Sequence, residues 1–114
     1  MKSIPEFIIS TAQKVPVDQQ NTKDVEGYFY STNSEVQIAI WDSKNQRESK
    51  IHSNPFDEYM ICVSGEYTAH FNGNEYTLNP GDELFIPKNT EQWGECKANT
   101  RTIHFFNGKR IKIE

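Results

Sequence analysis

The stretch Ile51–Gly65, IHSNPFDEYMICVSG, and the stretch Gly81–Cys96, GDELFIPKNTEQWGEC, decide the fold that this sequence predicts. Each stretch places polar side chains of the kind that bind ligands next to a β-strand pattern, and the first ends on a glycine that can turn the chain tightly. Two such segments facing each other would build one polar cluster inside a barrel. We therefore expect the function of the chain to lie where these two stretches meet.

Alternating polar and apolar residues predict β-strands along most of the chain. Residues 36–41 alternate with a period of two, so that Ala39 and Trp41 share one face. Asn72-Gly73 joins two further alternating runs and is typical of the left-handed turn of a β-hairpin. This pattern predicts an all-β, antiparallel fold, either a small barrel or a jelly-roll sandwich. Other strands are predicted at residues 58–63, 84–86 and 100–106, and the only helix signal is a single turn at residues 10–14.

The length of 114 residues fits a single domain that spans residues 1–114. Residues 13–24 are polar and are interpreted as a surface arm or loop with no place of its own in the core. We therefore expect an N-terminal arm or edge strand at residues 1–24 and a barrel at residues 25–114.

The chain is mildly acidic, with a formal net charge of −4 and a sequence pI near 5.4. Such a charge repels phosphate backbones and anionic lipid surfaces on average, so neither nucleic acid nor a membrane is an expected partner. The basic residues Lys109, Arg110 and Lys112 have no aromatic residues between them and are interpreted as a solvated end. The N-terminus lacks the apolar core of a secretory signal, which predicts a cytoplasmic location, where Cys62 and Cys96 would be reduced thiols.

The two opening stretches resemble the two signature motifs of the cupin superfamily. The first motif carries two histidines, a glutamate and a closing glycine, and the residues at those positions are His52, Asn54, Glu58 and Gly65. The second carries a glycine, a proline, a histidine and an asparagine, and those positions hold Gly81, Pro87, Gln92 and Cys96. The resemblance covers residues 35–107. It implies the double-stranded β-helix of a small single-domain cupin, an RmlC-like jelly-roll barrel.

The resemblance also implies where a metal would lie. In cupins three histidines and the glutamate converge on one divalent metal, whereas here Asn54 and Gln92 replace two of the imidazoles. An amide oxygen is a weaker donor to a transition metal than an imidazole nitrogen, so such a site would hold its metal less firmly. The metal in question would be Zn, Ni, Mn or Fe, and the ligand set at the matching positions is His52, Asn54, Glu58 and Gln92.

The sequence leaves three interpretations of this cluster open. It is a weak metal site, or a metal-free pocket that hydrogen-bonds a small polar molecule, or a buried network that only stiffens the barrel. His104 shares a face with Thr102 and Phe106 that could point into the barrel, whereas His70 is expected on the solvent-facing side of its strand. The ligand-binding candidates are therefore His52, Asn54, Glu58, Gln92 and His104.

The expected function is that of a small stand-alone cupin that binds a small polar molecule, with or without a divalent metal. The alternative is a metal-dependent enzyme of dioxygenase or isomerase/epimerase type that acts on a small polar or sugar-like substrate. In that case Glu58 as base and His52 as metal ligand or acid are the catalytic candidates. Because isolated cupin barrels commonly pair through sheet edges or an exchanged N-terminal strand, we also expect a homodimer.

Overall fold

The computed structural model describes residues 1–112 of the chain, and β-strands make up most of its regular structure. Two short helical segments, α1 (Glu6–Thr11) and the 3-10 turn η1 (Val17–Gln19), lie near the N-terminus. Within residues 1–112, neither segment has the length or the apolar character that crossing a membrane requires. The strands are β1 (Gln13–Lys14), β2 (Glu26–Ser31), β3 (Gln37–Ser43), β4 (Arg47–Glu48), β5 (Glu58–Ser64), β6 (Tyr67–Phe71), β7 (Asn74–Leu78), β8 (Glu83–Ile86), β9 (Trp93–Cys96) and β10 (Thr100–Phe106).

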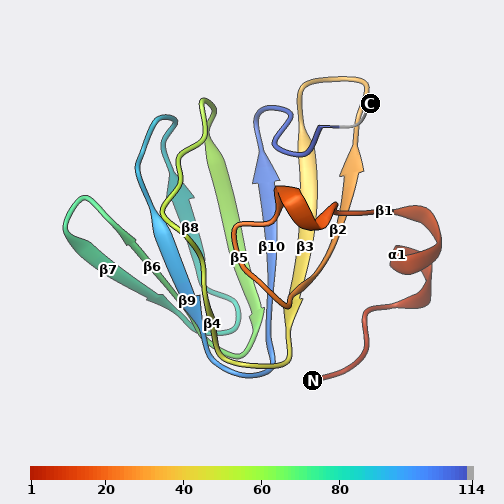
Figure 1. Ribbon diagram of the computed structural model, residues 1–114, viewed down its shortest axis with the longest axis horizontal. Coiled ribbons are helices and arrows are strands. Elements are labelled where there is room, and N and C mark those ends of the chain that lie inside the picture. Colours follow the sequence, from red (N-terminus) through yellow and green to blue (C-terminus); the bar gives the residue numbers. More distant parts are fainter. Residues whose placement is uncertain (113–114) are drawn as a thin grey trace.

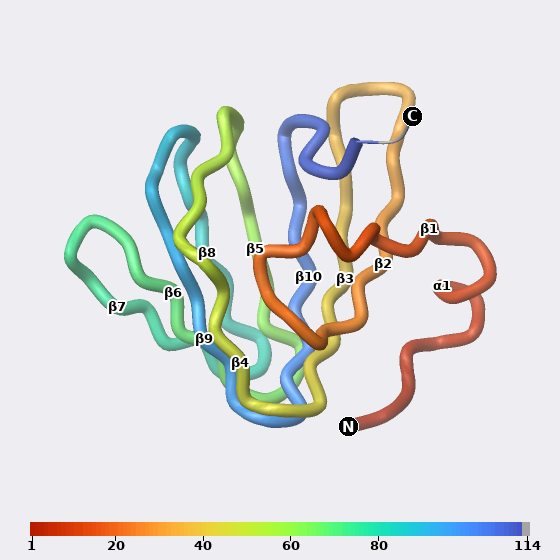
Figure 2. The backbone as a smooth tube through the Cα atoms, viewed as in Figure 1, coloured from red at the N-terminus to blue at the C-terminus, as the bar shows by residue number. Residues whose placement is uncertain are grey.

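The strands form two antiparallel sheets, which confirms the predicted fold (Figure 1). One sheet has the order β1-β2-β3-β10-β5-β8, and the other has the order β4-β9-β6-β7. The smoothed backbone in Figure 2 shows the chain passing between the sheets at both ends: β3 leads to β4 and β9 leads to β10 at the bottom of the view, whereas the segments from β4 to β5 and from β8 to β9 turn at the top. The last strand, β10, lies in the middle of the larger sheet between β3 and β5.

The two motif stretches, residues 51–65 and 81–96, lie side by side. An isolated antiparallel bridge joins His52 to Gln92, with backbone N–H···O distances of 2.9 and 2.8 Å. Strand β5 begins at Glu58, six positions after His52. Between them, the carbonyl oxygen of Asn54 accepts a hydrogen bond from the amide of Asn89 at 2.7 Å. These backbone bonds bring both stretches to the same region of the barrel.

Apolar side chains fill the space between the sheets away from that region. One cluster joins the two sheets through Met60 and Cys62 on β5, which are 0% exposed, and Phe71 on β6. Burying a large apolar side chain of this kind stabilises the fold by roughly 1.5–3 kcal/mol relative to leaving it exposed. A second cluster lies between β2, β3 and β10 and contains Val15, Phe29, Ala39, Phe106 and Ile111.

The N-terminal segment differs from its sequence interpretation. The helix covers Glu6–Thr11, not the single turn expected at residues 10–14, and its Ile8 packs on the outer face of the larger sheet against Tyr28 and Ile40. Val15 is only 1% exposed, so the segment does contribute to the core. The apolar signal was missed because it consists of a few isolated residues whose burial depends on contacts with distant strands.

Two glycines hold backbone conformations that other residues resist. Asn72 and Gly73 have φ angles of 53° and 73°, and they close the β6–β7 hairpin that the sequence predicted. Gly65, after β5, has a φ of 74°, and a Cβ atom there would lie 2.3 Å from the Oγ1 atom of Thr100. A side chain at residue 65 would therefore push β5 away from the start of β10.

Candidate functional site

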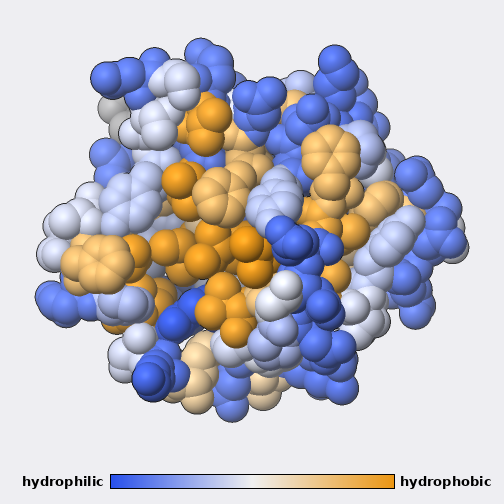
Figure 3. All heavy atoms as spheres, turned by 180° about the vertical axis from the view of Figure 1, so that it is seen from behind, coloured by the Kyte–Doolittle hydropathy of each residue, from blue (hydrophilic) through white to orange (hydrophobic). Residues whose placement is uncertain are grey.

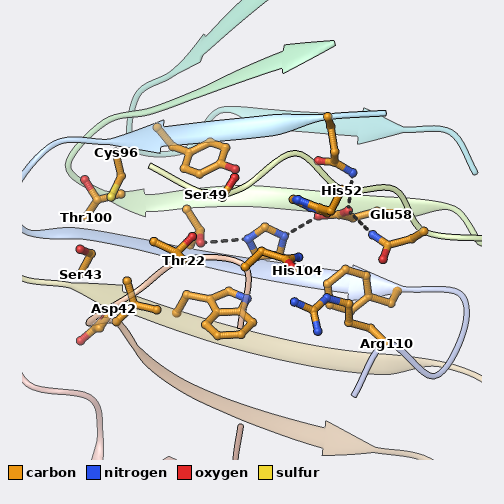
Figure 4. A pocket seen from close by; sticks show the side chains of 18 residues that line it. Thr22, Asp42, Ser43, Ser49, His52, Glu58, Cys96, Thr100, His104 and Arg110 are labelled. Carbon is orange, nitrogen blue, oxygen red and sulfur yellow. Dashed lines mark hydrogen bonds and ion pairs between the residues drawn. The ribbon is translucent and has the colours of Figure 1, made fainter. Parts of the chain in front are cut away.

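A cavity lies between the two sheets at the end of the barrel where the motif stretches meet (Figure 4). It contains about 670 Å³ of space not filled by atoms, part of it open to solvent. Side chains from both sheets and from the loop before β2 form its walls. The residues that line it include Trp41, His52, Asn54, Glu58, Tyr67, Gln92, Thr102, His104 and Arg110.

Glu58 is the centre of the polar network in this cavity. It begins β5, and the alternation that directs Met60 and Cys62 into the core directs Glu58 inward as well, leaving it 4% exposed. Its Oε2 atom accepts a hydrogen bond from Nδ1 of His104 at 2.7 Å. Its Oε1 atom accepts hydrogen bonds from Nε2 of Gln92 at 3.2 Å and from Nδ2 of Asn54 at 3.3 Å. Three side chains from three parts of the sequence therefore converge on one carboxylate.

These neighbours keep Glu58 ionised although it is buried. Burial alone would raise the pKa of its carboxyl group, because a charge is poorly solvated inside a protein. The hydrogen bond from His104, the attraction of either neighbouring imidazole when it is protonated, and the Gln92 hydrogen bond together outweigh burial and lower the pKa below its ordinary value of 4.5. Glu58 is therefore a carboxylate at neutral pH, and it can only accept hydrogen bonds.

The acceptor role of Glu58 fixes one proton of His104, the one on Nδ1. Because a carboxylate only accepts, Nδ1 of His104 must carry a proton. The second ring nitrogen, Nε2, lies 2.9 Å from Oγ1 of Thr102, whose hydroxyl group can either donate or accept. His104 is 7% exposed, so both of its nitrogens are engaged within the protein. The imidazole therefore orients the carboxylate.

His52 is placed differently from His104. Its Nδ1 atom lies 2.9 Å from the carbonyl oxygen of Lys50, and since a carbonyl only accepts, Nδ1 carries the proton. Burial lowers the pKa of His52, and the Lys50 hydrogen bond and the charge of Glu58 only partly oppose this effect. The ring is therefore neutral at pH 7, and its Nε2 atom is left as a lone-pair acceptor on the cavity wall.

Tyr67 offers the complementary group. It lies on β6 and lines the cavity, and within residues 1–112 its hydroxyl group has no hydrogen-bond partner. Burial raises its pKa well above the ordinary value, so the hydroxyl group keeps its proton and remains a donor. Gly94 gives this ring its space, because a Cβ atom at Gly94 would lie 1.8 Å from the Tyr67 hydroxyl oxygen.

The donor set does not fit a transition metal held by the four motif positions. Asn54 and Gln92 turn their NH₂ groups to Glu58, which directs N–H donors, not oxygen lone pairs, toward the carboxylate. A metal bound to Glu58 would have to displace those donors. Within residues 1–112, no group of three or more His, Cys, Asp or Glu side chains is placed to hold a metal ion. Among those four positions, His52 alone presents a free ligand atom of the type that such metals prefer.

All five ligand-binding candidates named from the sequence line this one cavity, and they are His52, Asn54, Glu58, Gln92 and His104. His70 lies outside it, on the opposite face of β6, where its ring stacks on Trp93 at 3.9 Å and its Nε2 atom lies 2.7 Å from Glu95. The expectation that His70 faces solvent needs correction, because Trp93 covers the ring and leaves the side chain 15% exposed.

Sequence reasoning missed the role of Arg110. We interpreted it as part of a solvated basic end, but its side chain lines the cavity and its Cζ atom lies 5.9 Å from the centre of the Trp41 ring. Figure 4 shows Arg110 at the same end of the cavity as Glu58, far from Cys96 and Thr100. Ile111, which is 1% exposed, was the available signal, because an apolar residue within the basic end indicates a buried segment.

Comparison with known proteins identifies relatives of this fold. The family model described as "Cupin domain" matches residues 40–106. The sequence matches no functionally curated protein.

Several solved structures share the fold at low sequence identity. An RmlC-like cupin from Shewanella frigidimarina is 16% identical with a TM-score of 0.71, and the match covers 85% of this chain and 84% of that one. KdgF from a Halomonas species is 16% identical with a TM-score of 0.64, covering 84% and 93%. The polyketide cyclase RemF from Streptomyces resistomycificus is 13% identical with a TM-score of 0.68, covering 93% and 78%. At these identities the similarity is one of fold.

Proposed function

The chain belongs to the cupin domain family, and from that premise we propose that it binds a small polar molecule in the cavity around Glu58, chiefly through hydrogen bonds. One observation carries this proposal. The network around Glu58 is satisfied internally, while an acceptor on His52 and a donor on Tyr67 face the cavity without protein partners among residues 1–112.

The arrangement favours binding over a purely structural network. A network that only stiffened the barrel would need no groups turned toward the cavity. Among residues 1–112 no buried side-chain nitrogen or oxygen lacks a partner, so the unpaired atoms of His52 and Tyr67 are open to the cavity, where a ligand can reach them. The Tyr67 hydroxyl group and the His52 Nε2 atom would pair with a hydroxyl group of a ligand, which both donates and accepts. Since Glu58 and His104 already hold fixed orientations, the ligand would not have to order them on binding.

The proposal is tested with a library of small polar molecules and the thermal stability of the protein. We expect at least one molecule to raise the melting temperature, and we expect Tyr67→Phe to reduce that shift because it removes only the hydroxyl donor. Tyr76→Phe is the matched control, since Tyr76 lies on the neighbouring strand β7 outside the cavity. Equal ligand shifts in both variants would contradict the proposed site.

A second candidate function is a metal-dependent enzyme. The free Nε2 atom of His52 favours it, and similar folds include a protein named as a polyketide cyclase. The metal content of protein purified without a chelating column separates the two candidates. One equivalent of Zn, Ni, Mn or Fe that is lost in His52→Ala would favour the enzyme, whereas metal far below one equivalent would favour binding through hydrogen bonds.

We also propose that the chain pairs with a second copy of itself through the outer face of the larger sheet. There Phe105, Tyr59 and Phe85 lie opposite one another on β10, β5 and β8, and the two phenylalanines are 36% and 56% exposed. Figure 3 shows apolar side chains gathered across the middle of the face seen from behind. A two-fold contact would place this patch on its own copy. Ile8 and Val15 are buried within their own chain, so an exchanged N-terminal strand is the less favoured route.

A further inference from the structure

The C-terminal segment, residues 107–112, places Arg110 in the wall of the cavity. Gln37, which is 1% exposed on β3, holds it through two hydrogen bonds. The amide of Ile111 donates to Oε1 of Gln37 at 2.8 Å, and Nε2 of Gln37 donates to the carbonyl oxygen of Ile111 at 2.7 Å. A buried side chain thus pairs with both polar groups of one backbone unit, which fixes the position of the residue beside it, Arg110.

Two further contacts hold the same segment. Gln19 repeats the pairing with the amide and carbonyl groups of Lys112, at 2.8 Å in each case. Gly108 packs so closely on Phe56 that a Cβ atom there would lie 2.1 Å from the ring. The backbone is therefore held on both sides of Arg110, and its side chain projects from a fixed support.

The guanidinium group of Arg110 has no acidic partner among residues 1–112, nor does it donate a hydrogen bond to any acceptor there. The other arginines differ, because Arg101 pairs with Asp42 and Arg47 lies 3.4 Å from Asp24. Burial lowers the pKa of Arg110 and the charge of Glu58 partly opposes this effect, but an arginine stays charged in proteins. A positive charge is thus held in the cavity over the face of Trp41.

We propose that Arg110, supported by Trp41, recognises a carboxylate group, so that the molecule bound in this cavity is a small carboxylate. This inference rests on the proposed function and narrows the class of its ligand. A guanidinium group matches the two oxygens of a carboxylate in a paired geometry. A single negative charge balances Arg110, whereas a phosphate dianion would place a second charge near ionised Glu58, and neither a lysine nor a second arginine lines the cavity.

The test compares matched neutral and anionic molecules: benzoate with benzamide, lactate with lactamide, and gluconate with sorbitol. Binding is followed on the full chain through the indole N–H resonance of Trp41, which a Trp93→Phe variant distinguishes from that of Trp93. We expect at least one carboxylate to bind about tenfold or more tightly than its neutral partner, because hydrogen bonds to charged groups are the stronger ones. Arg110→Gln should abolish the preference, and Arg110→Lys should keep part of it.

Lys109→Gln is the matched control, because it removes the same charge one residue away. The Nζ atom of Lys109 donates to the carbonyl oxygen of Thr32 at 3.0 Å and does not line the cavity. This variant should keep the full preference for the carboxylate. An equal loss in Lys109→Gln and Arg110→Gln would mean that net charge alone attracts the anion, and it would overturn the inference.

The remaining outcomes separate this inference from the proposed function. If neutral molecules bind as tightly as carboxylates, the proposed binding site is supported and the inferred preference for a carboxylate is wrong. If no carboxylate shifts the Trp41 resonance up to about 50 mM, a range that includes very weak binding, the inference also falls. A chain ending at Lys112 is tested in parallel. Carboxylate binding seen only in that shortened chain would mean that the last two residues occupy Arg110, and it would overturn the inference too.

Discussion

At the cavity end of the larger sheet, the inner and outer faces reverse the usual pattern of a β-sandwich. Sheets of this kind normally bury apolar residues and expose polar ones. On β10, however, Thr102 and His104 point inward and are 4% and 7% exposed, while Phe105 lies on the outer face and is 36% exposed. Glu58 on the inner face of β5 and Tyr59 on its outer face show the same reversal. Hydrophobic burial does not explain such a distribution.

The comparison shows that the inner face carries polar residues for a reason other than stability. Met60 and Cys62 follow Glu58 on the same face and are completely buried, so the barrel does use apolar packing one step further along the strand. Polar groups at the cavity end stay buried at no large cost only because each finds a partner. Among the described residues, no buried side-chain nitrogen or oxygen lacks one. The two faces can therefore be compared by removing one group at a time.

Glu58→Gln should have the largest effect on stability. The substitution keeps the size of the side chain but removes the charge that accepts from His104, Gln92 and Asn54, and it brings a third NH₂ group beside those of Asn54 and Gln92. We expect a loss of about 3 kcal/mol in the free energy of unfolding, measured by urea denaturation. Glu83→Gln, on the outer face of β8, is the control and should change it by about 0.5 kcal/mol or less. Similar losses of unfolding free energy in Glu58→Gln and Glu83→Gln would contradict the claimed difference between the inner and outer faces.

Gln37→Ala should have the next largest effect. It leaves the amide and carbonyl groups of Ile111 without partners in a buried position, at a cost of about 2 kcal/mol. Because the wall that carries Arg110 is then released, the variant should also weaken carboxylate binding. Gln46→Ala, at an exposed position, should leave both the stability and the binding unchanged. Full binding in Gln37→Ala would show that Arg110 needs no such support.

Acid should destabilise the fold in two steps. Burial lowers the pKa of His52 below its ordinary value of 6.5, so the unfolded chain binds that proton first and stability falls as the pH drops below about 6.5. The pKa of Glu58 is also lowered, so a second loss follows below about 4.5, as the pH falls through its folded value. His52→Gln should remove the first step alone in urea denaturation measured as a function of pH. An unchanged first step would assign it to another group.

Phe105→Asp should have the smallest effect on folding and a clear effect on association. Because Phe105 is already partly exposed and contacts Tyr59 on the outer face, we expect a loss of about 1 kcal/mol or less. A charge in the apolar patch should shift the sedimentation coefficient from that of a dimer to that of a monomer. Lys97→Asp, at an exposed position outside the patch, is the control. A wild-type protein that sediments as a monomer would contradict the proposed pairing.

The sequence predicted the fold well because its signals are local. Strand alternation and the Asn72-Gly73 turn depend on neighbouring residues, and the structure confirms both. Alternation also placed His104 on the face that lines the cavity. These features follow from the pleat of a strand and from the φ angles that a hairpin requires, so no knowledge of distant contacts was needed.

The features that the sequence did not predict depend on contacts between distant residues. Arg110 enters the cavity because Gln37, 73 positions earlier by residue number, fixes the neighbouring backbone. The orientation of the amides of Asn54 and Gln92 follows from the charge on Glu58, which in turn depends on His104. Neither the direction of an amide nor the charge of a buried carboxyl group is visible in a motif. The cytoplasmic location stays a prediction.

The most direct test of the account is the titration of Glu58, followed through the NMR signal of its carboxyl carbon. The central claim is that the cavity is built around this side chain in its ionised form. We predict a midpoint below the ordinary value of 4.5, accompanied by a change in the ring signals of His104. A midpoint above 4.5, or a titration that leaves His104 unaffected, would contradict the claim.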